Sequence, residues 1–320
     1  MKRILLVRLS SLGDVLHTFP ATTDIGRALP DAALDWVVEE AYVPLVRMHP
    51  GVARAIPFAL RRWRRELLSV RAWRELAALR ATLRERTYDA IIDAQGLIKS
   101  ACVAGLARGP VYGYSAGTAR ERFAARLYDV TYDIGPEQHS VDRYRALAAR
   151  VLGYLPDPPI DYGIVAPPAP AFAPREPYCV LLHSTARAEK LWSEAAWVEV
   201  GRVLEARRVV CVLPWGRRDE RARAERLAAA LARAIIAPRM TMDEAAGLIG
   251  HATAVVGLDT GLMHLAVAQR VPVVGIYCSS EPSRTGPLGT GRISVRGGIG
   301  RPPSAAEVLD ALADVAPSLA

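Results

Sequence analysis

The chain has 320 residues, more than one hydrophobic core normally organises and enough for two domains. Its composition is 51% hydrophobic and 23% charged, and its mean hydropathy is +0.12, which together exclude a disordered chain. The net charge of +8 indicates an anionic partner, but it does not choose between nucleic acid, a phosphorylated small molecule and an anionic membrane.

Cysteine, lysine and the first residues narrow the class of protein further. The four cysteines are far apart and form no CxxC pair, which excludes a disulfide framework and a zinc ribbon and indicates a reducing cytoplasm. The first apolar run, Ile4 to Val7, is broken by Arg8 and is too short for a signal peptide or a membrane span. Because only three of the 41 basic residues are lysines, a lysine is a better functional sign here than an arginine.

Runs of Val, Ile and Leu of strand length alternate with Ala-, Leu- and Arg-rich stretches of helix length. This alternation predicts an α/β fold with largely parallel sheets. In the first half we predict strands over 3–8, 33–38, 55–57, 90–93 and 111–114, and helices over 15–28, 72–86, 98–107, 120–128 and 141–152. In the second half we predict strands over 178–183, 209–213, 234–237, 254–257 and 273–277, and an amphipathic helix over 304–315 with Ser304 as its N-cap.

Residues 156–177 are dense in proline and have no sustained hydrophobic period, which predicts a stiff connector. We therefore expect an N-terminal domain over 1–160, a linker over 161–177 and a C-terminal domain over 178–320. Because open parallel sheets bind ligands at the carboxyl ends of their strands, we expect a ligand cleft between the two domains.

The first strand runs into a small turn, Ser10-Ser11-Leu12-Gly13-Asp14, that is followed by a helix. Such a turn leaves backbone N–H groups free and directs a helix dipole at the cleft. Asp14 has two interpretations here. It is either a capping or first-turn acid, stabilising the helix by about 0.5–2 kcal/mol, or a general base.

Two strand ends in the second half have groups suited to a diphosphate sugar. Thr260 and Gly261 would supply backbone N–H groups to a phosphate, while Asp259 would accept hydrogen bonds from sugar hydroxyls, since it would repel the phosphate itself. In the other loop, Ser184 and Thr185 offer hydroxyl groups and Lys190 offers a point charge. A capped helix and a solvated lysine are the ordinary structural alternatives.

The densest basic cluster contains Arg61, Arg62 and Arg64 around Trp63. It suits an anionic acceptor, nucleic acid or plain solvent, and no nucleic-acid-binding motif accompanies it, so nucleic acid ranks last. Among the histidines we find no metal-ligand spacing, and we expect neither a metal site nor a cofactor.

Eight segments in order resemble the ADP-heptose:lipopolysaccharide heptosyltransferases of Gram-negative bacteria, glycosyltransferase family 9, and within that family the type that adds the first heptose. They are SSLGDVLHTFPA (10–21), DWVVEE (35–40), IPFALRRWRR (56–65), YDAIIDAQGLIKSA (88–101), TARE (118–121), KLW (190–192), LPWG (213–216) and DTGLMHLAVA (259–268). The resemblance implies a GT-B fold, in which two Rossmann-like domains face each other across a cleft. It also implies a terminal helix able to pack back on the N-terminal domain.

The resemblance further implies an inverting transfer of L-glycero-D-manno-heptose from ADP-heptose to a Kdo residue of Kdo2-lipid A, at the cytoplasmic face of the inner membrane. Asp14 matches the proposed general base, and Lys190 matches a catalytic contact to the diphosphate. The implied donor-binding residues are Ser184, Thr185, Lys190, Glu220 (ribose), Met240 (adenine), Asp259 (heptose), Thr260, Gly261 and His264. The implied acceptor-binding residues are Ser11, Gly13, Arg61, Arg62, Arg64 and Arg120.

One position departs from the family pattern, because Ala186 stands where relatives can have a second threonine beside Thr185. Three other functions remain as alternatives. A heptosyltransferase that adds the second heptose would share the donor site, and a GT-B-shaped sugar-nucleotide epimerase would need carboxylates in both domains. A basic RNA-binding protein would use the arginines and have no use for Asp14 or Lys190. We expect partners to be ADP-heptose, Kdo2-lipid A and the anionic inner membrane, and not nucleic acid.

Overall fold

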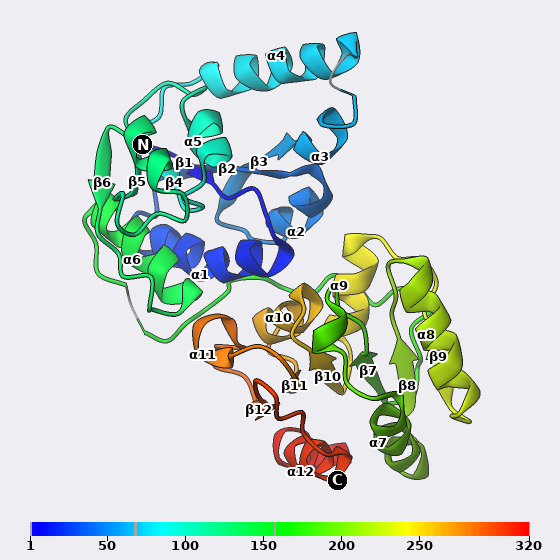
Figure 1. The fold of residues 1–320 in the computed structure, drawn as a ribbon. Coiled ribbons are helices and arrows are strands. Elements are labelled where there is room, and N and C mark those ends of the chain that lie inside the picture. The colour runs from blue at the N-terminus through cyan, green and yellow to red at the C-terminus, as the bar shows by residue number, and fades with distance from the viewer. Residues whose placement is uncertain (1, 67–68, 157, 320) are drawn as a thin grey trace. The chain divides into compact units, whose positions relative to one another are not determined.

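The structure is a computed structural model that describes residues 2–66, 69–156 and 158–319. The chain divides into two compact units, Met1–Ile164 and Val165–Ala320, each built on a six-stranded sheet whose strands are all parallel (Figure 1). The predicted α/β class is confirmed. Of the linker expected over 161–177, Tyr162 and Ile164 are buried in the first unit, and Asp157 before it lies outside the described residues.

The first sheet has the strand order β3-β2-β1-β4-β5-β6. Figure 1 shows α4 and α5 on one face of this sheet and α1 and α6 on the other. Its strands are β1 (Arg3–Val7), β2 (Ala33–Glu39), β3 (Val52–Phe58), β4 (Ala90–Asp93), β5 (Val111–Tyr114) and β6 (Val130–Tyr132). Its helices are α1 (Leu12–Ala28), α2 (Val43–Arg47), α3 (Leu60–Trp63), α4 (Val70–Arg84), α5 (Ile98–Ala104) and α6 (Ser140–Leu152), with 3₁₀ turns η1 (Glu40–Tyr42) and η2 (Arg122–Leu127).

The second sheet has the order β12-β11-β10-β7-β8-β9. Its strands are β7 (Tyr178–Leu182), β8 (Val210–Leu213), β9 (Ala234–Ile236), β10 (Ala254–Leu258), β11 (Val273–Tyr277) and β12 (Ile293–Gly297). Its helices are α7 (Glu194–Ala206), α8 (Arg218–Ala229), α9 (Met242–Gly250), α10 (Gly261–Ala268), α11 (Pro282–Thr285) and α12 (Ala305–Val315), with η3 (Ala188–Lys190) and η4 (Pro317–Leu319).

The structure differs from the predicted elements in two respects. The helix predicted over 120–128 is the 3₁₀ segment η2, which buries only Ala124 and therefore lacks the apolar stripe that stabilises an α-helix. Strands β6 and β12 were not predicted, because neither has the continuous apolar run of the fully buried strands. The terminal helix α12 begins after Ser304 as predicted, and its apolar face packs on β11, β12 and α7 of the second unit.

No helix within the described ranges combines the length and the apolar character that crossing a bilayer requires.

Candidate active site

The turn after β1 places Asp14 in the first turn of α1. Ser11 is the N-cap, and both its backbone N–H and its hydroxyl donate to Asp14 Oδ2, at 3.2 Å and 3.1 Å. Gly13 lies inside the same turn. Asp14 therefore has the helix-stabilising role that was one of its two interpretations from the sequence. Its remaining contacts bear on the second interpretation, a general base.

A buried arginine forms an ion pair with Asp14. Arg8 follows the last residue of β1 and is 1% exposed, and its Nη2 lies 2.5 Å from Asp14 Oδ1. The same Nη2 donates to the Tyr144 hydroxyl at 2.6 Å, and that hydroxyl donates to Asp14 Oδ1 at 3.0 Å. Arg8 Nη1 is held by the carbonyl of Ala94 at 2.7 Å. Strand β1, helix α1 and helix α6 thus meet at one closed network.

This network decides the charge of Asp14. Burial alone would raise the pKa of the carboxyl, but Arg8, Arg120 and the Ser11 amide outweigh burial and hold that pKa well below its usual range. Asp14 is therefore ionised at neutral pH. Sequence reasoning missed Arg8 and Tyr144, although a charged residue interrupting the apolar end of the first strand was the signal that could have identified Arg8.

Of the predicted acceptor residues, the structure brings Ser11, Gly13 and Arg120 to Asp14. Arg120 Nη1 lies 3.7 Å from Asp14 Oδ2 and its side chain is 53% exposed, so the guanidinium can reach a second anion. The other three arginines lie in and just after α3, and no contact among the described residues joins them to Asp14.

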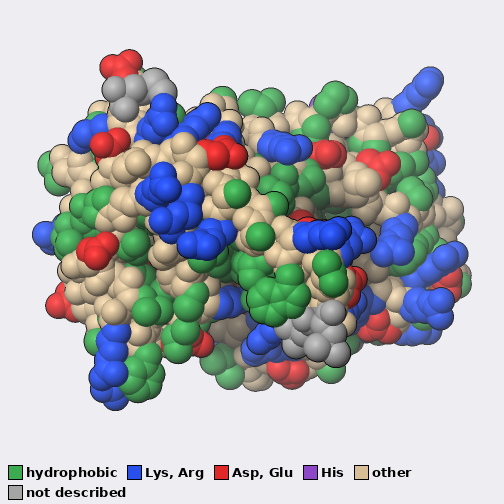
Figure 2. Space-filling view, turned by 90° about the horizontal axis from the view of Figure 1, so that it is seen from above, with side chains coloured by type: hydrophobic (Ala, Val, Ile, Leu, Met, Phe, Trp, Pro, Cys, Tyr) green, Lys and Arg blue, Asp and Glu red, His purple; other side chains and the backbone are tan. Residues whose placement is uncertain are grey.

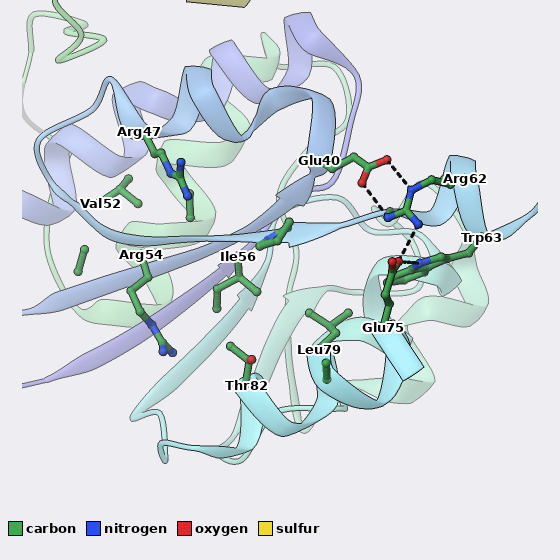
Figure 3. A pocket seen from close by; sticks show the side chains of 15 residues that line it. Glu40, Arg47, Val52, Arg54, Ile56, Arg62, Trp63, Glu75, Leu79 and Thr82 are labelled. Carbon is green, nitrogen blue, oxygen red and sulfur yellow. Dashed lines mark hydrogen bonds and ion pairs between the residues drawn. The ribbon is translucent and has the colours of Figure 1, made fainter. Parts of the chain in front are cut away.

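These three arginines differ from one another. Arg62 binds Glu40 (Nη2–Oε2, 3.1 Å) and Glu75 (Nη1–Oε2, 2.8 Å), so α3 is tied to η1 and α4 through this side chain (Figure 3). The Arg61 amide donates to Glu39 at 3.2 Å, and its side chain, like that of Arg64, is exposed. Arg61 and Arg64 thus remain suited to an acceptor, whereas Arg62 has a structural role.

Arg62 also lines a cavity of about 630 Å³ between the edge strand β3 and helix α4 (Figure 3). Its walls mix the apolar side chains of Ile56 and Leu79 with the charges of Glu40 and Arg54. Asp14 does not line this cavity.

In the second unit the residues predicted to bind a diphosphate sugar meet at the carboxyl ends of β7, β10 and β11. Lys190 Nζ lies 2.5 Å from Asp259 Oδ2, and both side chains are mostly buried. Ser280, after β11, donates its hydroxyl to the same oxygen at 2.9 Å. Burial would raise the pKa of Asp259, but hydrogen bonds from His264, Lys190 and Ser280 hold it well below its usual range. Asp259 is thus an anion that positions Lys190.

Helix α10 presents its N-terminus beside this ion pair. Thr260 is the N-cap and Gly261 the first helical residue, so the first N–H groups have no intrahelical acceptor. The Thr260 hydroxyl is buried without a hydrogen-bond partner among the described residues. His264, on the same helix, has Nε2 at 3.8 Å from Asp259 Oδ1. This arrangement offers amide, hydroxyl and ammonium donors to an anion.

Ser184 and Thr185 lie half-buried in the loop between β7 and η3 that leads to Lys190. The Ser184 hydroxyl is 2.8 Å from His183 Nδ1, and burial, followed by the charge of Arg223, lowers the pKa of His183 to about 4. His183 is therefore neutral at physiological pH and belongs to the core of the unit.

Glu220 and Met240 lie farther along the same sheet edge, after β8 and β9. Glu220 accepts hydrogen bonds from the amides of Gly216 (2.8 Å) and Arg217 (3.0 Å) and so caps α8. Met240 is half-buried in the loop before α9. No contact among the described residues joins either of them to Lys190. Following the strand order β11-β10-β7-β8-β9, the predicted donor residues form one row along the sheet edge.

No three His, Cys, Asp or Glu side chains gather into a metal-ligand set within the described ranges.

Comparison with known proteins gives the same family over most of the chain. Residues 76–308 match the family model of glycosyltransferase family 9 (heptosyltransferase). Lipopolysaccharide heptosyltransferase 1 of Pseudomonas aeruginosa is 42% identical over 293 residues, covering 91% of this chain and 82% of that protein.

Two solved structures of the Escherichia coli heptosyltransferase WaaC are similar to this chain. The one with ADP has a TM-score of 0.89 at 38% identity, and the one with ADP-2-deoxy-2-fluoro heptose has 0.85 at 37%. Both comparisons cover 96% of this chain and 98% of the solved chain.

Proposed function

Since the chain belongs to glycosyltransferase family 9, we propose that it transfers L-glycero-D-manno-heptose from ADP-heptose to a Kdo residue of the lipopolysaccharide inner core, with inversion at the anomeric carbon. It is a glycosyltransferase of the GT-B class, as the two parallel sheets and the likeness to WaaC show. Addition of the second heptose is not favoured, because heptosyltransferase 1 of Pseudomonas aeruginosa is 42% identical over 91% of this chain, whereas the solved Escherichia coli heptosyltransferase II is 24% identical to it.

The observation that supports this mechanism best is the ionised carboxylate of Asp14, held in the turn after β1 by Arg8 and Ser11. In the proposed reaction, the acceptor hydroxyl oxygen forms a bond to the anomeric carbon while the bond from that carbon to the diphosphate breaks. The hydroxyl becomes acidic as the new bond forms, and its proton passes to Asp14. A carboxylate with a low pKa can therefore accept this proton late in the reaction.

The negative charge that develops on the departing ADP must be stabilised by hydrogen-bond donors of the protein. Lys190 Nζ has three N–H donors, of which Asp259 takes one, so the ammonium can bind a phosphate oxygen while Asp259 holds it. The amides at Thr260 and Gly261 would bind the second phosphate. Met240 and Glu220 would then contact the nucleoside, since they follow strands farther along the edge.

We further propose that Kdo2-lipid A is the acceptor and that Arg61, Arg64 and Arg120 bind its carboxylates and phosphates. The exposed guanidinium groups and the net charge of +8 support this contact. An acceptor of this kind is a membrane lipid, so we propose that the protein works at the cytoplasmic face of the inner membrane in peripheral contact with anionic lipid.

The decisive experiment compares transfer from ADP-heptose to Kdo2-lipid A with transfer to the same core already carrying one heptose. Activity on the first acceptor alone supports the proposal, and activity on the second alone overturns it in favour of the second heptosyltransferase. Thermal stabilisation by ADP-heptose, with none by oligonucleotides, tests the donor site separately and would dispose of the nucleic-acid alternative.

A further inference from the structure

A second cavity in the first unit lies between α3, α4 and α5 and has a volume of about 400 Å³. We call it the α4 groove. Its walls are side chains such as Phe58, Leu60, Leu76 and Leu106, and Lys99 is the charged member of its lining among the described residues. A cavity of this size and character suits a hydrocarbon chain and offers almost no hydrogen bonds to a polar ligand.

Helix α4 carries large apolar side chains on its outward face beside the groove. Val70 is 65% exposed and Trp73 is 63% exposed, whereas Leu79 and Leu83 are buried on the inward face of the helix. Trp73 also lines the groove. An exposed indole next to an apolar groove is typical of a surface that meets the boundary between membrane and water.

The charge around the groove fits an anionic surface. Residues 60–84 contain eight arginines and two glutamates, and one of those glutamates, Glu75, already pairs with Arg62 and Arg71. Arg65 and Arg74 are exposed and form no ion pair with any described residue. Figure 2, which looks down on this side of the first unit, shows blue basic side chains interspersed with green hydrophobic ones.

The groove also flanks the functional edge of the first sheet. Phe58 is the last residue of β3, and Lys99 lies in the first turn of α5, which follows β4. Asp14 follows β1, which lies between β2 and β4 in the same parallel sheet. A membrane bound to the groove would therefore lie near the edge of the sheet that carries Asp14.

We propose that the face formed by α3, α4 and α5 docks on a bilayer of anionic lipids, with Trp73 at the interface and a lipid hydrocarbon chain in the α4 groove. This inference rests on the proposed contact with an anionic membrane and assigns that contact to particular residues. Its occupant is a bilayer lipid and not the acyl chain of the acceptor, because the outward face of α4 adds a broad apolar and basic surface beyond the groove.

The test uses the full chain and vesicles of phosphatidylglycerol and phosphatidylcholine that contain neither acceptor nor donor. Co-sedimentation should require phosphatidylglycerol and weaken with salt. The triple variant Arg65→Gln, Arg74→Gln, Lys99→Gln should lower vesicle affinity about a hundredfold, since each basic residue near an anionic surface contributes about fivefold. A matched control, Arg150→Gln, Arg202→Gln, Arg239→Gln, removes the same charge from exposed positions elsewhere.

Two native side chains report on the groove. Cys102 lines the groove and is exposed, whereas the other three cysteines are buried, so a maleimide should label it selectively, and more slowly when vesicles are bound. Brominated lipid should quench the fluorescence of the wild-type chain more than that of Trp73→Phe, because Trp73 is 63% exposed, whereas Trp36, Trp63, Trp192 and Trp197 are buried. Both effects should appear together.

Three results would overturn the inference. They are absence of binding to anionic vesicles, equal loss of binding in the two triple variants, and binding that leaves Cys102 labelling and Trp73 fluorescence unchanged. Protection of Cys102 only by vesicles that contain Kdo2-lipid A would assign the groove to the acceptor instead. Transfer to a deacylated, water-soluble acceptor should stay unchanged in the triple variant, so failure of docking and failure of the proposed activity can be told apart.

Discussion

Replacing Asp14 by asparagine separates its structural contacts from its chemistry. The capping role alone predicts that Asp14→Asn folds almost normally, because an amide oxygen can also accept the N-cap hydrogen bond. The structure changes this expectation. Arg8 is 1% exposed, and Asp14 is its counter-ion at 2.5 Å, so the substitution leaves a buried guanidinium without its anion.

Removing one partner of a buried ion pair costs about 3–5 kcal/mol in the free energy of unfolding, and the asparagine oxygen should keep the loss near the lower value. For a unit of this size, that corresponds to a fall in Tm of roughly 6–12 °C. If Asp14 is the general base, as proposed, the substitution should also lower kcat roughly 10²–10⁴-fold. Thermal melting without ligand and steady-state transfer rates measure the two effects separately.

The control is Asp24→Asn, which breaks the ion pair between Asp24 and Arg145 (2.6 Å) that joins the same two helices, α1 and α6. It should lower the Tm to a similar degree and leave kcat within a few-fold of wild type. The double variant Asp14→Asn, Arg8→Met should regain stability without regaining kcat. An Asp14→Asn protein that melts like wild type, or a double variant with normal turnover, would refute the reasoning.

Three further predictions follow from other parts of the structure. Lys190→Ala should reduce kcat/KM for ADP-heptose about tenfold to hundredfold while acceptor KM stays constant, and Lys190→Arg should rescue it poorly, because the site holds a compact ammonium against Asp259. Unaltered donor kinetics would show that Lys190 does not contact the diphosphate. Replacing Arg61 and Arg64 by Gln should raise acceptor KM and its salt dependence, whereas Arg62→Gln should chiefly loosen the contact of α3 with Glu40 and Glu75, seen as faster proteolysis near residue 65. Equal kinetic effects of all three would contradict this division. Burial lowers the pKa of His49 to about 4, so between pH 6.5 and pH 4 the unfolded state binds a proton at this residue that the folded state does not. The free energy of unfolding should therefore fall as the pH is lowered through this range, and it should fall less in His49→Gln. Urea unfolding at several pH values measures both.

Much of the fold was predictable, because the strands β1, β4, β7, β10 and β11 are continuous apolar runs and their parallel order follows from the alternation with helices. The positions of Asp14, Lys190 and Asp259 at strand ends follow from the same pattern. The closed network around Asp14 was not predictable. Tyr144 is 130 residues from Asp14 in the chain, and no local pattern indicates that α6 carries its hydroxyl to α1.

Ser280 illustrates the same limit in the second unit. Its hydroxyl bonds Asp259 across neighbouring strands, a pairing that depends on the adjacency of β10 and β11. From the sequence, Arg62 could not be distinguished from Arg61 and Arg64, and all three were predicted to bind the acceptor. Its role differs because Glu40 and Glu75 converge on it from two other elements.

The ion pair between Lys190 and Asp259 has a consequence for product release. In the proposed reaction ADP leaves with its diphosphate still facing the Lys190 ammonium, and Asp259, 2.5 Å from that ammonium, competes for it as an internal anion. If Lys190 binds the diphosphate as proposed, Asp259 stays bound to the same ammonium and weakens its attraction for ADP, so we expect ADP to leave faster than it would without this carboxylate. We therefore expect a variant without this carboxylate to hold its nucleotide product longer and to be more strongly inhibited by it.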